Sequence, residues 1–211
     1  VSVVVVVYES GPTLAQCLAA LRSQTFVSFE TLLVDNASSD RTAQAAAGAD
    51  SALILIENVR NLGFATAVNQ AARAARGRWL ALLNPDAYAA PDWLERLVAA
   101  AAENPTVRSF ASRQLMADDP SRLDGLGDVM SLAGYPFRGG FGHTDPGDTS
   151  PGWVFSACGG AMLIDRALFL GLGGFDERLF CYCEDVDLGY RLRLVREPTL
   201  LVPGAVVRHV G

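Results

Sequence analysis

Short runs of β-branched and aliphatic residues alternate along the chain with longer segments whose apolar residues recur every three or four positions. The first run, residues 3–7, consists of valines and contains no polar residue. An unbroken run of this kind is typical of a strand that is buried on both faces of a parallel sheet. Comparable runs predict four further strands before residue 117, at residues 31–34, 53–56, 79–83 and 107–116.

The segments between these runs have helical periodicity. Four apolar residues after the first strand share one helical face: Leu14, Cys17, Leu18 and Leu21. They predict a helix over residues 13–24, with Thr13 as its N-cap. Further helices are predicted at residues 65–75 and 91–102, with a short Ala-rich helix before the third strand. Strands that alternate with helices in this way predict an α/β fold with a Rossmann-like, mostly parallel central sheet and helices on both faces.

Residues 117–151 differ from the rest of the chain. They are rich in Asp, Gly and Pro, have little periodicity, and are longer than a structural loop usually is. Two interpretations are open, a variable surface loop and a flap over a site. After this segment the pattern predicts a strand at 154–156, helices at 165–170 and up to 193, and a last strand at 206–209.

Polar residues follow three of the predicted strands at the point where each strand ends. These residues are Tyr8-Glu9, Asp35-Asn36 and Asn84-Pro85-Asp86. In open α/β sheets, ligands bind outside the carboxyl ends of the strands. We therefore expect a binding site at this edge of the sheet.

Composition and charge restrict the partners. The chain has 211 residues, half of them apolar, so it can bury a sizeable core as one large domain or two small ones. Its 17 basic residues are all Arg and are outnumbered by 23 acidic residues, which gives a net charge of −6. This balance argues against binding to nucleic acid or to an anionic membrane, because both need a basic surface. It leaves open a nucleotide that is held through a metal ion.

The cysteines and the chain ends indicate the cellular setting. Four cysteines without a Cys-x-x-Cys spacing predict neither a disulfide scaffold nor a zinc site, and we expect buried thiols in a reducing compartment. No apolar run approaches the roughly 18 residues of a membrane span, and no signal peptide is visible. We expect a cytoplasmic protein that does not cross the membrane. A start without Met and an end after a strand-like run indicate a catalytic domain trimmed from a longer chain.

Several common catalytic patterns are absent from the sequence. No Gly-x-Gly-x-x-Gly turn follows the first strand, a Walker loop is excluded because there is no Lys, and no Gly-x-Ser-x-Gly elbow occurs. A set of carboxylates and one late histidine remain. Oxygen ligands with an imidazole suit Mg²⁺ or Mn²⁺ better than structural zinc.

Each residue of this set also has a simpler interpretation. Asp86 can belong to an ordinary Asn-Pro-Asp turn, although a carboxylate at a strand end can also hold a divalent ion. Glu184, Asp185 and Asp187 open a predicted helix, where acids stabilise the N-terminus. Asp187 is spaced to pair with the arginine one turn later, which leaves Asp185 the freer acid. His209 lies in an apolar strand, where a lone histidine is more often a core residue than a ligand.

In combination and in order, these motifs resemble the family 2 glycosyltransferases of GT-A fold, in particular their rhamnosyltransferase-like branch. The resemblance extends over essentially the whole chain. The matching segments are Val-Ser-Val-Val-Val-Val-Val-Tyr8, Val34-Asp35-Asn36-Ala-Ser-Ser-Asp40, Asn61-Leu-Gly63-Phe-Ala with Asn69, Leu83-Asn84-Pro85-Asp86-Ala, Gly159-Gly160-Ala-Met-Leu-Ile, Gly174-Phe-Asp-Glu, Glu184-Asp185-Val-Asp187-Leu and Val207-Arg-His209-Val-Gly.

For the donor, the resemblance implies that Tyr8 stacks on the nucleotide base and that Asp35 accepts a hydrogen bond from the base imide. Five further residues of the matching motifs are implied to bind the nucleotide sugar: Asn61, Gly63, Asn69, Asn84 and Gly160. Glu9 departs from the family, which usually has Asn at this position. An extra carboxylate would repel a diphosphate unless it is turned away or paired.

For catalysis, the resemblance implies a divalent cation, Mg²⁺ or Mn²⁺, as cofactor. Asp86 matches the metal-binding acid of the family, with Asn84 in place of the first acid of that motif, and His209 matches a late metal-binding histidine. Asp185 matches the catalytic base. Glu184 is implied to support that base or to bind the acceptor.

The implied reaction is inverting transfer of a sugar, with rhamnose favoured, in the synthesis of cell-wall or surface polysaccharide. The favoured donor is deoxythymidine-diphosphate rhamnose, with a UDP-sugar as the other choice, and the acceptor is a glycan or a lipid-linked glycan. The resemblance implies a single GT-A catalytic domain over 1–211. Its nucleotide-sugar-binding half is 1–116, its variable loop 117–151, and its acceptor and catalytic half 152–211.

Two other functions remain open. A sugar-1-phosphate nucleotidyltransferase shares this kind of sheet and metal, but the Gly-rich basic loop that such enzymes carry after the first strand is missing. A catalytically silent nucleotide-sugar-binding domain is the second alternative. The intact Glu184-Asp185 pair and His209 argue against it.

Overall fold

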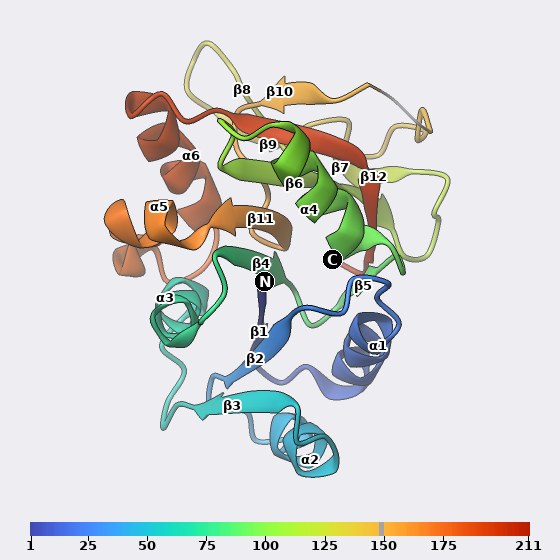
Figure 1. Cartoon of the computed structure of the whole chain (residues 1–211), viewed down its shortest axis with the longest axis vertical. Coiled ribbons are helices and arrows are strands. Elements are labelled where there is room, and N and C mark those ends of the chain that lie inside the picture. The colour runs from blue at the N-terminus through green and yellow to red at the C-terminus, as the bar shows by residue number, and fades with distance from the viewer. Residues whose placement is uncertain (148–149) are drawn as a thin grey trace.

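One large sheet organises the computed structural model, which describes residues 1–147 and 150–211 (Figure 1). Residues 148 and 149, within the loop expected at 117–151, lie outside the described residues. The strands in the described part are β1 (Ser2–Val7), β2 (Glu30–Asp35), β3 (Leu53–Glu57), β4 (Trp79–Leu83), β5 (Ala87–Ala89), β6 (Ser109–Met116), β7 (Leu123–Gly125), β8 (Asp128–Met130), β9 (Pro136–Arg138), β10 (Gly152–Val154), β11 (Ala161–Asp165) and β12 (Thr199–His209).

The sheet is mostly parallel. Its order is β10-β12-β6-β11-β4-β1-β2-β3, with β5 beside β12 and β7 beside β6, which makes ten strands in the described part of the chain. Strands β3, β2, β1 and β4 run parallel to one another, and β6 runs parallel to β12. β11 lies antiparallel between β4 and β6 and joins these two parallel groups.

Helices cover both faces of this sheet. They are α1 (Gly11–Arg22), α2 (Thr42–Ala49), α3 (Phe64–Ala74), α4 (Trp93–Glu103), α5 (Arg166–Gly171) and α6 (Glu184–Leu194), with one 3₁₀ turn, η1 (Glu177–Leu179). Helices α1, α2 and α4 pack on one face, and α3, α5 and α6 on the other (Figure 1). The predicted α/β fold with helices on both faces is therefore confirmed.

β1 illustrates why an unbroken valine run fits this position. Val3, Val5 and Val7 pack in the layer of α1 and α4, whereas Val4 and Val6 pack in the layer of α3 and α5. Successive strand side chains point to opposite faces, so a strand covered on both sides needs apolar residues at every position. All six residues of β1 are buried.

The start of the first helix differs from the prediction. α1 begins at Gly11, with Pro12 inside its first turn, and not at the predicted N-cap Thr13. Proline fits there because the first-turn N–H groups have no partner inside the helix. The Thr13 hydroxyl donates back to the Ser10 carbonyl oxygen at 2.7 Å. The Gly-Pro pair therefore belongs to the helix.

The segment expected as a loop at 117–151 contains regular structure. β7 pairs antiparallel with β6 and so extends the main sheet, while β8 and β9 form a separate hairpin. These strands are only three residues long, and periodicity cannot be detected over so short a stretch. For the same reason the sequence did not indicate β5, which also has three residues. The last strand, β12, is longer than predicted, with eleven residues where four were expected.

The expectation of buried cysteines is correct only in part. Cys17 is buried and Cys158 half-buried, but Cys181 and Cys183 are exposed, and all four are free thiols in the described chain. Across the described ranges, no helix combines the length and the apolar character needed to cross a bilayer.

Candidate active site

The carboxyl ends of β1 and β4 open into a hollow of about 650 Å³, which we call the strand-end hollow. Both strands run in the same direction, so the residues that follow them meet at one edge of the sheet. Five of the residues implied by the resemblance line this hollow: Tyr8, Asn61, Gly63, Asn84 and Asp86. Tyr8 is 52% exposed, so its ring is available to a ligand.

A second hollow of about 240 Å³ lies at the start of α6, and we call it the helix hollow. Four more of the implied residues line it, together with Asn84: Gly160, Glu184, Asp185 and His209. Phe64, Asn84 and Cys181 line both hollows, so the two lie side by side and share a wall. Asp86, after β4, and the acids that open α6 therefore face adjoining hollows.

His209 reaches this space because of how β12 ends. β5 pairs with β12 and places His209 opposite Ala87, the residue after Asp86. The His209 Nε2 atom lies 3.4 Å from Asp86 Oδ1, and its Nδ1 atom lies 2.9 Å from Asp124 Oδ2. Burial alone would lower the pKa of His209, but the hydrogen bonds to Asp124 and Asp86 raise it to about 9. Burial alone would raise the pKa of Asp86, but His209 lowers it.

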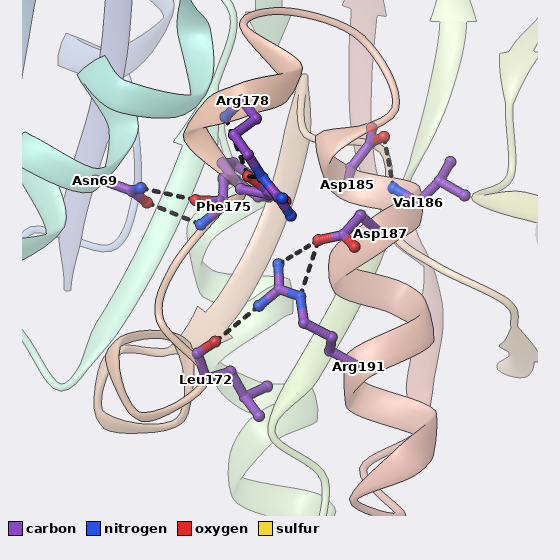
Figure 2. Close-up of polar contacts among 9 residues, drawn as sticks. Asn69, Leu172, Phe175, Arg178, Asp185, Val186, Asp187 and Arg191 are labelled. Atoms are coloured by element: carbon purple, nitrogen blue, oxygen red, sulfur yellow. Dashed lines mark hydrogen bonds and ion pairs between the residues drawn. The ribbon is translucent and has the colours of Figure 1, made fainter.

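Asp185 is held in place by backbone hydrogen bonds. Its Oδ2 accepts from the Gly159 N–H at 2.8 Å. Its Oδ1 accepts from the Val186 N–H at 2.8 Å, as Figure 2 shows. Burial raises the pKa of Asp185 in spite of these bonds. The helical spacing predicted that Asp185 is freer than Asp187, but the Asp185 carboxylate is engaged as well. The spacing within α6 could not show that the Gly159 N–H, from another segment, donates to Asp185.

Glu184 is the more buried acid of the pair, at 5% exposure. Burial, and then the charge of Asp185, raise its pKa to about 7. Its Oε2 atom is buried and has no hydrogen-bond partner among the described residues. A carboxyl group in this environment changes its charge near neutral pH.

The turn between η1 and α6 forms the wall shared by the hollows. Phe180, Tyr182 and Cys183 have positive φ angles of 59°, 72° and 66°, which are strained for residues other than glycine. The Phe180 carbonyl oxygen accepts from the Ala65 N–H. A side chain at Gly63 would lie 2.6 Å from that same oxygen, so the close approach of the turn to α3 requires glycine there.

Two implied donor-binding residues lie outside the linings of both hollows. Asp35 ends β2, but its side chain is buried and accepts from the Ser38 N–H at 3.0 Å and from Gln44 Nε2 at 2.6 Å. Asn69 is buried on α3, and its amide exchanges hydrogen bonds with the backbone N–H and C=O of Phe175 (Figure 2). The structure thus gives Asn69 contacts that connect α3 to the segment before η1.

Glu9 lines the strand-end hollow but is engaged elsewhere. Its carboxylate accepts from the Ser39 N–H at 2.8 Å and from the Ser39 hydroxyl at 3.2 Å. Two neutral donors therefore hold the Glu9 carboxylate towards Ser39, and no arginine pairs with it among the described residues. In α6, the predicted pair forms: Arg191 Nη2 lies 2.7 Å from Asp187 Oδ2 (Figure 2).

Three charged residues at the site were not anticipated. Asp124, Asp128 and Arg138 come from the segment that was expected to be a loop, and Asp128 and Arg138 line the helix hollow. Arg138 Nη1 lies 2.6 Å from Asp124 Oδ1, and Asp128 accepts from the Ser156 hydroxyl at 2.7 Å. Isolated acids in a Gly-rich segment carry no sequence signal, because their partners are distant along the chain.

Asp86 and His209 fit a divalent cation only as part of a larger ligand set. Within residues 1–147 and 150–211, no cluster of three or more His, Cys, Asp or Glu side chains is arranged to hold a metal ion. The donor types are nevertheless suitable, since His209 has one ring nitrogen directed at Asp86 and the other hydrogen-bonded to a carboxylate. Other ligands of such an ion would have to come from a bound diphosphate and water.

Comparison with known proteins identifies the family. Residues 2–171 match the profile described as glycosyl transferase family 2. The chain is 33% identical to an N-acetylglucosaminyl-diphospho-decaprenol L-rhamnosyltransferase of Mycobacterium tuberculosis, over 98% of this chain and 75% of that protein. The likeness thus extends beyond the profile into α6 and β12.

Solved structures agree on the fold. GalNAc-T7 with UDP, GalNAc and Mn²⁺ has a TM-score of 0.81 and 20% identity, covering 99% of this chain and 43% of that chain. A mannosyltransferase from Pyrobaculum calidifontis with GDP-Man and Mn²⁺ has a TM-score of 0.74 and 21% identity, covering 99% and 56%. The chain therefore spans about half the length of these two enzymes. Its α/β fold is of the GT-A type, and the chain belongs to glycosyltransferase family 2.

Proposed function

We propose that this chain transfers a sugar, with inversion, from a nucleoside-diphosphate sugar to an acceptor hydroxyl, with Asp185 as the base. One observation carries the proposal: Asp86 and Asp185 line two adjoining hollows that share Asn84 in their walls. A diphosphate beside Asp86 and His209 would leave room for the sugar towards Asp185. Family membership supports the reaction class.

Asp185 would accept the proton of the acceptor hydroxyl while that oxygen forms its bond to C1 of the sugar. The bond from C1 to the diphosphate oxygen breaks on the opposite face, which inverts the configuration. The Gly159 and Val186 N–H groups support this role because they fix the carboxylate against rotation. The leaving diphosphate needs positive charge and not a protonating acid, so one base suffices.

Asp86 and His209 would hold Mg²⁺ or Mn²⁺. When bound, such an ion supplies positive charge to the departing diphosphate. The orientation of His209 supports the assignment, and so do two solved structures of this fold that contain Mn²⁺. Asn84, in place of an acid, would contribute a neutral side chain beside the two ligands.

For the donor and acceptor we propose rhamnose and a lipid-linked glycan. The support is the mycobacterial relative, whose name specifies L-rhamnose as the sugar and a diphospho-decaprenol lipid as the acceptor. We infer deoxythymidine-diphosphate rhamnose as the favoured donor, with UDP-sugars as the alternative. The setting that follows is cell-wall polysaccharide synthesis at the inner face of the membrane.

The test is a screen of transfer and donor hydrolysis over a panel of nucleotide sugars, with Mn²⁺, Mg²⁺ or a chelator. We expect turnover with one donor class, its loss in the chelator, and weaker metal-dependent nucleotide binding in Asp86→Ala. Asp118→Ala, which removes an exposed acid from another hollow, is the matched control and should bind nucleotide normally. Equal turnover in the chelator would contradict the metal site. Tight nucleotide binding without transfer or hydrolysis of any donor would instead favour a silent binding domain.

A further inference from the structure

The contacts of His209 extend beyond Asp86 into a segment that has no assigned role. Its Nδ1 atom lies 2.9 Å from Asp124 Oδ2, and both side chains are buried, at 6% and 7% exposure. Asp124 lies in β7, which the sheet holds through its pairing with β6. A buried carboxylate in direct contact with an imidazole is costly unless its hydrogen bonds are well satisfied.

Asp124 is itself fixed by a second partner. Its other oxygen, Oδ1, accepts from Arg138 Nη1 at 2.6 Å, at the end of β9. Arginine only donates hydrogen bonds, so this contact keeps Oδ1 occupied and directs Oδ2 to the ring. The four side chains form a line in the order Arg138, Asp124, His209 and Asp86.

We infer that Asp124 is a positioning residue for His209: it accepts the Nδ1–H, so that in the neutral imidazole Nε2, on the side of Asp86, is the nitrogen that can act as a ligand. A neutral imidazole has one donor nitrogen and one acceptor nitrogen, and a carboxylate at Nδ1 decides which is which. The inference rests on the proposed metal site. It gives Asp124 and Arg138, from the segment expected to be a surface loop or a flap, a role in supporting the metal site.

Asp124→Asn gives the inference a sharp test. The asparagine amide has one oxygen, whereas Arg138 and the Nδ1–H group each need an acceptor. If that oxygen stays with Arg138, the NH₂ group faces Nδ1, which must then accept, and the proton moves to Nε2. Nε2–H cannot bind a metal. In Asp124→Asn with Arg138→Met, the amide can turn over and return its oxygen to Nδ1.

Two readouts are measured on correctly folded variants, as judged by circular dichroism. The first is Mn²⁺ affinity by calorimetry in the presence of a nucleoside diphosphate. The second is the tautomer of His209, from ¹⁵N shifts of the metal-free protein at alkaline pH, assigned with His143→Gln because the chain has two histidines. Asp118→Asn is the matched control, since Asp118 is an exposed acid that lines the same hollow of about 790 Å³ as Asp124.

We expect Asp124→Asn to weaken Mn²⁺ binding roughly 10- to 100-fold and to move the ring proton to Nε2. The double variant should recover much of the affinity and the Nδ1–H tautomer, and Asp118→Asn should match the wild type. An unchanged tautomer in Asp124→Asn overturns the inference, whatever happens to the affinity. If wild-type protein binds no Mn²⁺, the proposed metal site fails, while the tautomer still decides the role of Asp124.

Discussion

At the scale of single residues, Asp185 has the most specific role in the proposed reaction. We expect Asp185→Asn to lower turnover by a factor on the order of 10² to 10⁴ while donor affinity stays near the wild-type value. Burial raises the pKa of Asp185 above its ordinary value of 3.8. As the pH is lowered, wild-type turnover should therefore begin to fall at a higher pH than it would if the base had an ordinary aspartate pKa. Both quantities come from steady-state kinetics with a donor titration.

Asp187→Asn is the matched control for this variant. Asp187 lies on the same helix, is paired with Arg191 and lies outside the helix hollow. The control should retain turnover and lose a little stability. Wild-type turnover in Asp185→Asn would remove Asp185 from the role of base.

The raised pKa of the neighbouring Glu184 leads to a prediction about how the stability of the chain depends on pH. Its pKa is raised from 4.5 to about 7 in the folded chain, so the unfolded chain loses this proton first as the pH rises. The folded state therefore loses stability between pH 4.5 and 7, by up to about 3 to 4 kcal/mol at roughly 1.4 kcal/mol per pKa unit. Glu184→Gln removes this penalty.

Chemical denaturation of both proteins at several pH values measures the effect. Glu184→Gln should have a larger free energy of unfolding than the wild type at pH 8, and the difference should shrink towards zero near pH 4. A variant that is less stable than the wild type at pH 8 would contradict the burial of an unpartnered carboxyl at this position.

At the scale of elements, Asn69 connects α3 to the segment that leads to η1. Its amide satisfies the N–H and the C=O of Phe175, and a side chain at Gly174 would lie 2.2 Å from Asn69 Oδ1. We expect Asn69→Ala to lower the free energy of unfolding by about 2 to 4 kcal/mol, because two buried backbone groups lose their partners.

A nucleotide-binding assay distinguishes this structural role of Asn69 from the donor-binding role that the resemblance implied. Asn69→Ala should bind nucleotide with wild-type affinity at a temperature at which it is folded. Gln70→Ala, on the same helix but half-buried, should cost less than about 1 kcal/mol. A large loss of nucleotide affinity with little change in stability would instead place Asn69 in the donor site.

At the scale of the whole molecule, one sheet brings together residues from both ends of the chain. β1 and β4 supply Tyr8 and Asp86 at their carboxyl ends, and β12 returns through β5 to place His209 beside Asp86. β11 lies next to β4, which allows the Asn84 N–H to donate to the Gly160 carbonyl oxygen at 2.9 Å. The fold thus brings together segments up to 201 residues apart, counted from Tyr8 to His209.

The sequence was sufficient for those parts of this arrangement that depend on long, regular patterns. The valine run of β1 indicated a doubly covered strand, and turn residues after parallel strands indicated the binding edge. Short strands such as β7 have no detectable period, and the contact between Asp124 and His209 spans 85 residues. Tertiary pairing of this kind has no local signal, so neither the support of His209 nor the backbone bonds of Asp185 could be predicted.

A crystal structure of the chain with Mn²⁺ and a nucleoside diphosphate, with anomalous diffraction data for manganese, tests the proposed metal and donor site most directly. We expect an anomalous peak at ligand distance from both Asp86 and His209, with the diphosphate in the strand-end hollow and its sugar-bearing end towards Asp185. A peak elsewhere, or a nucleotide bound on another face of the sheet, would contradict the account.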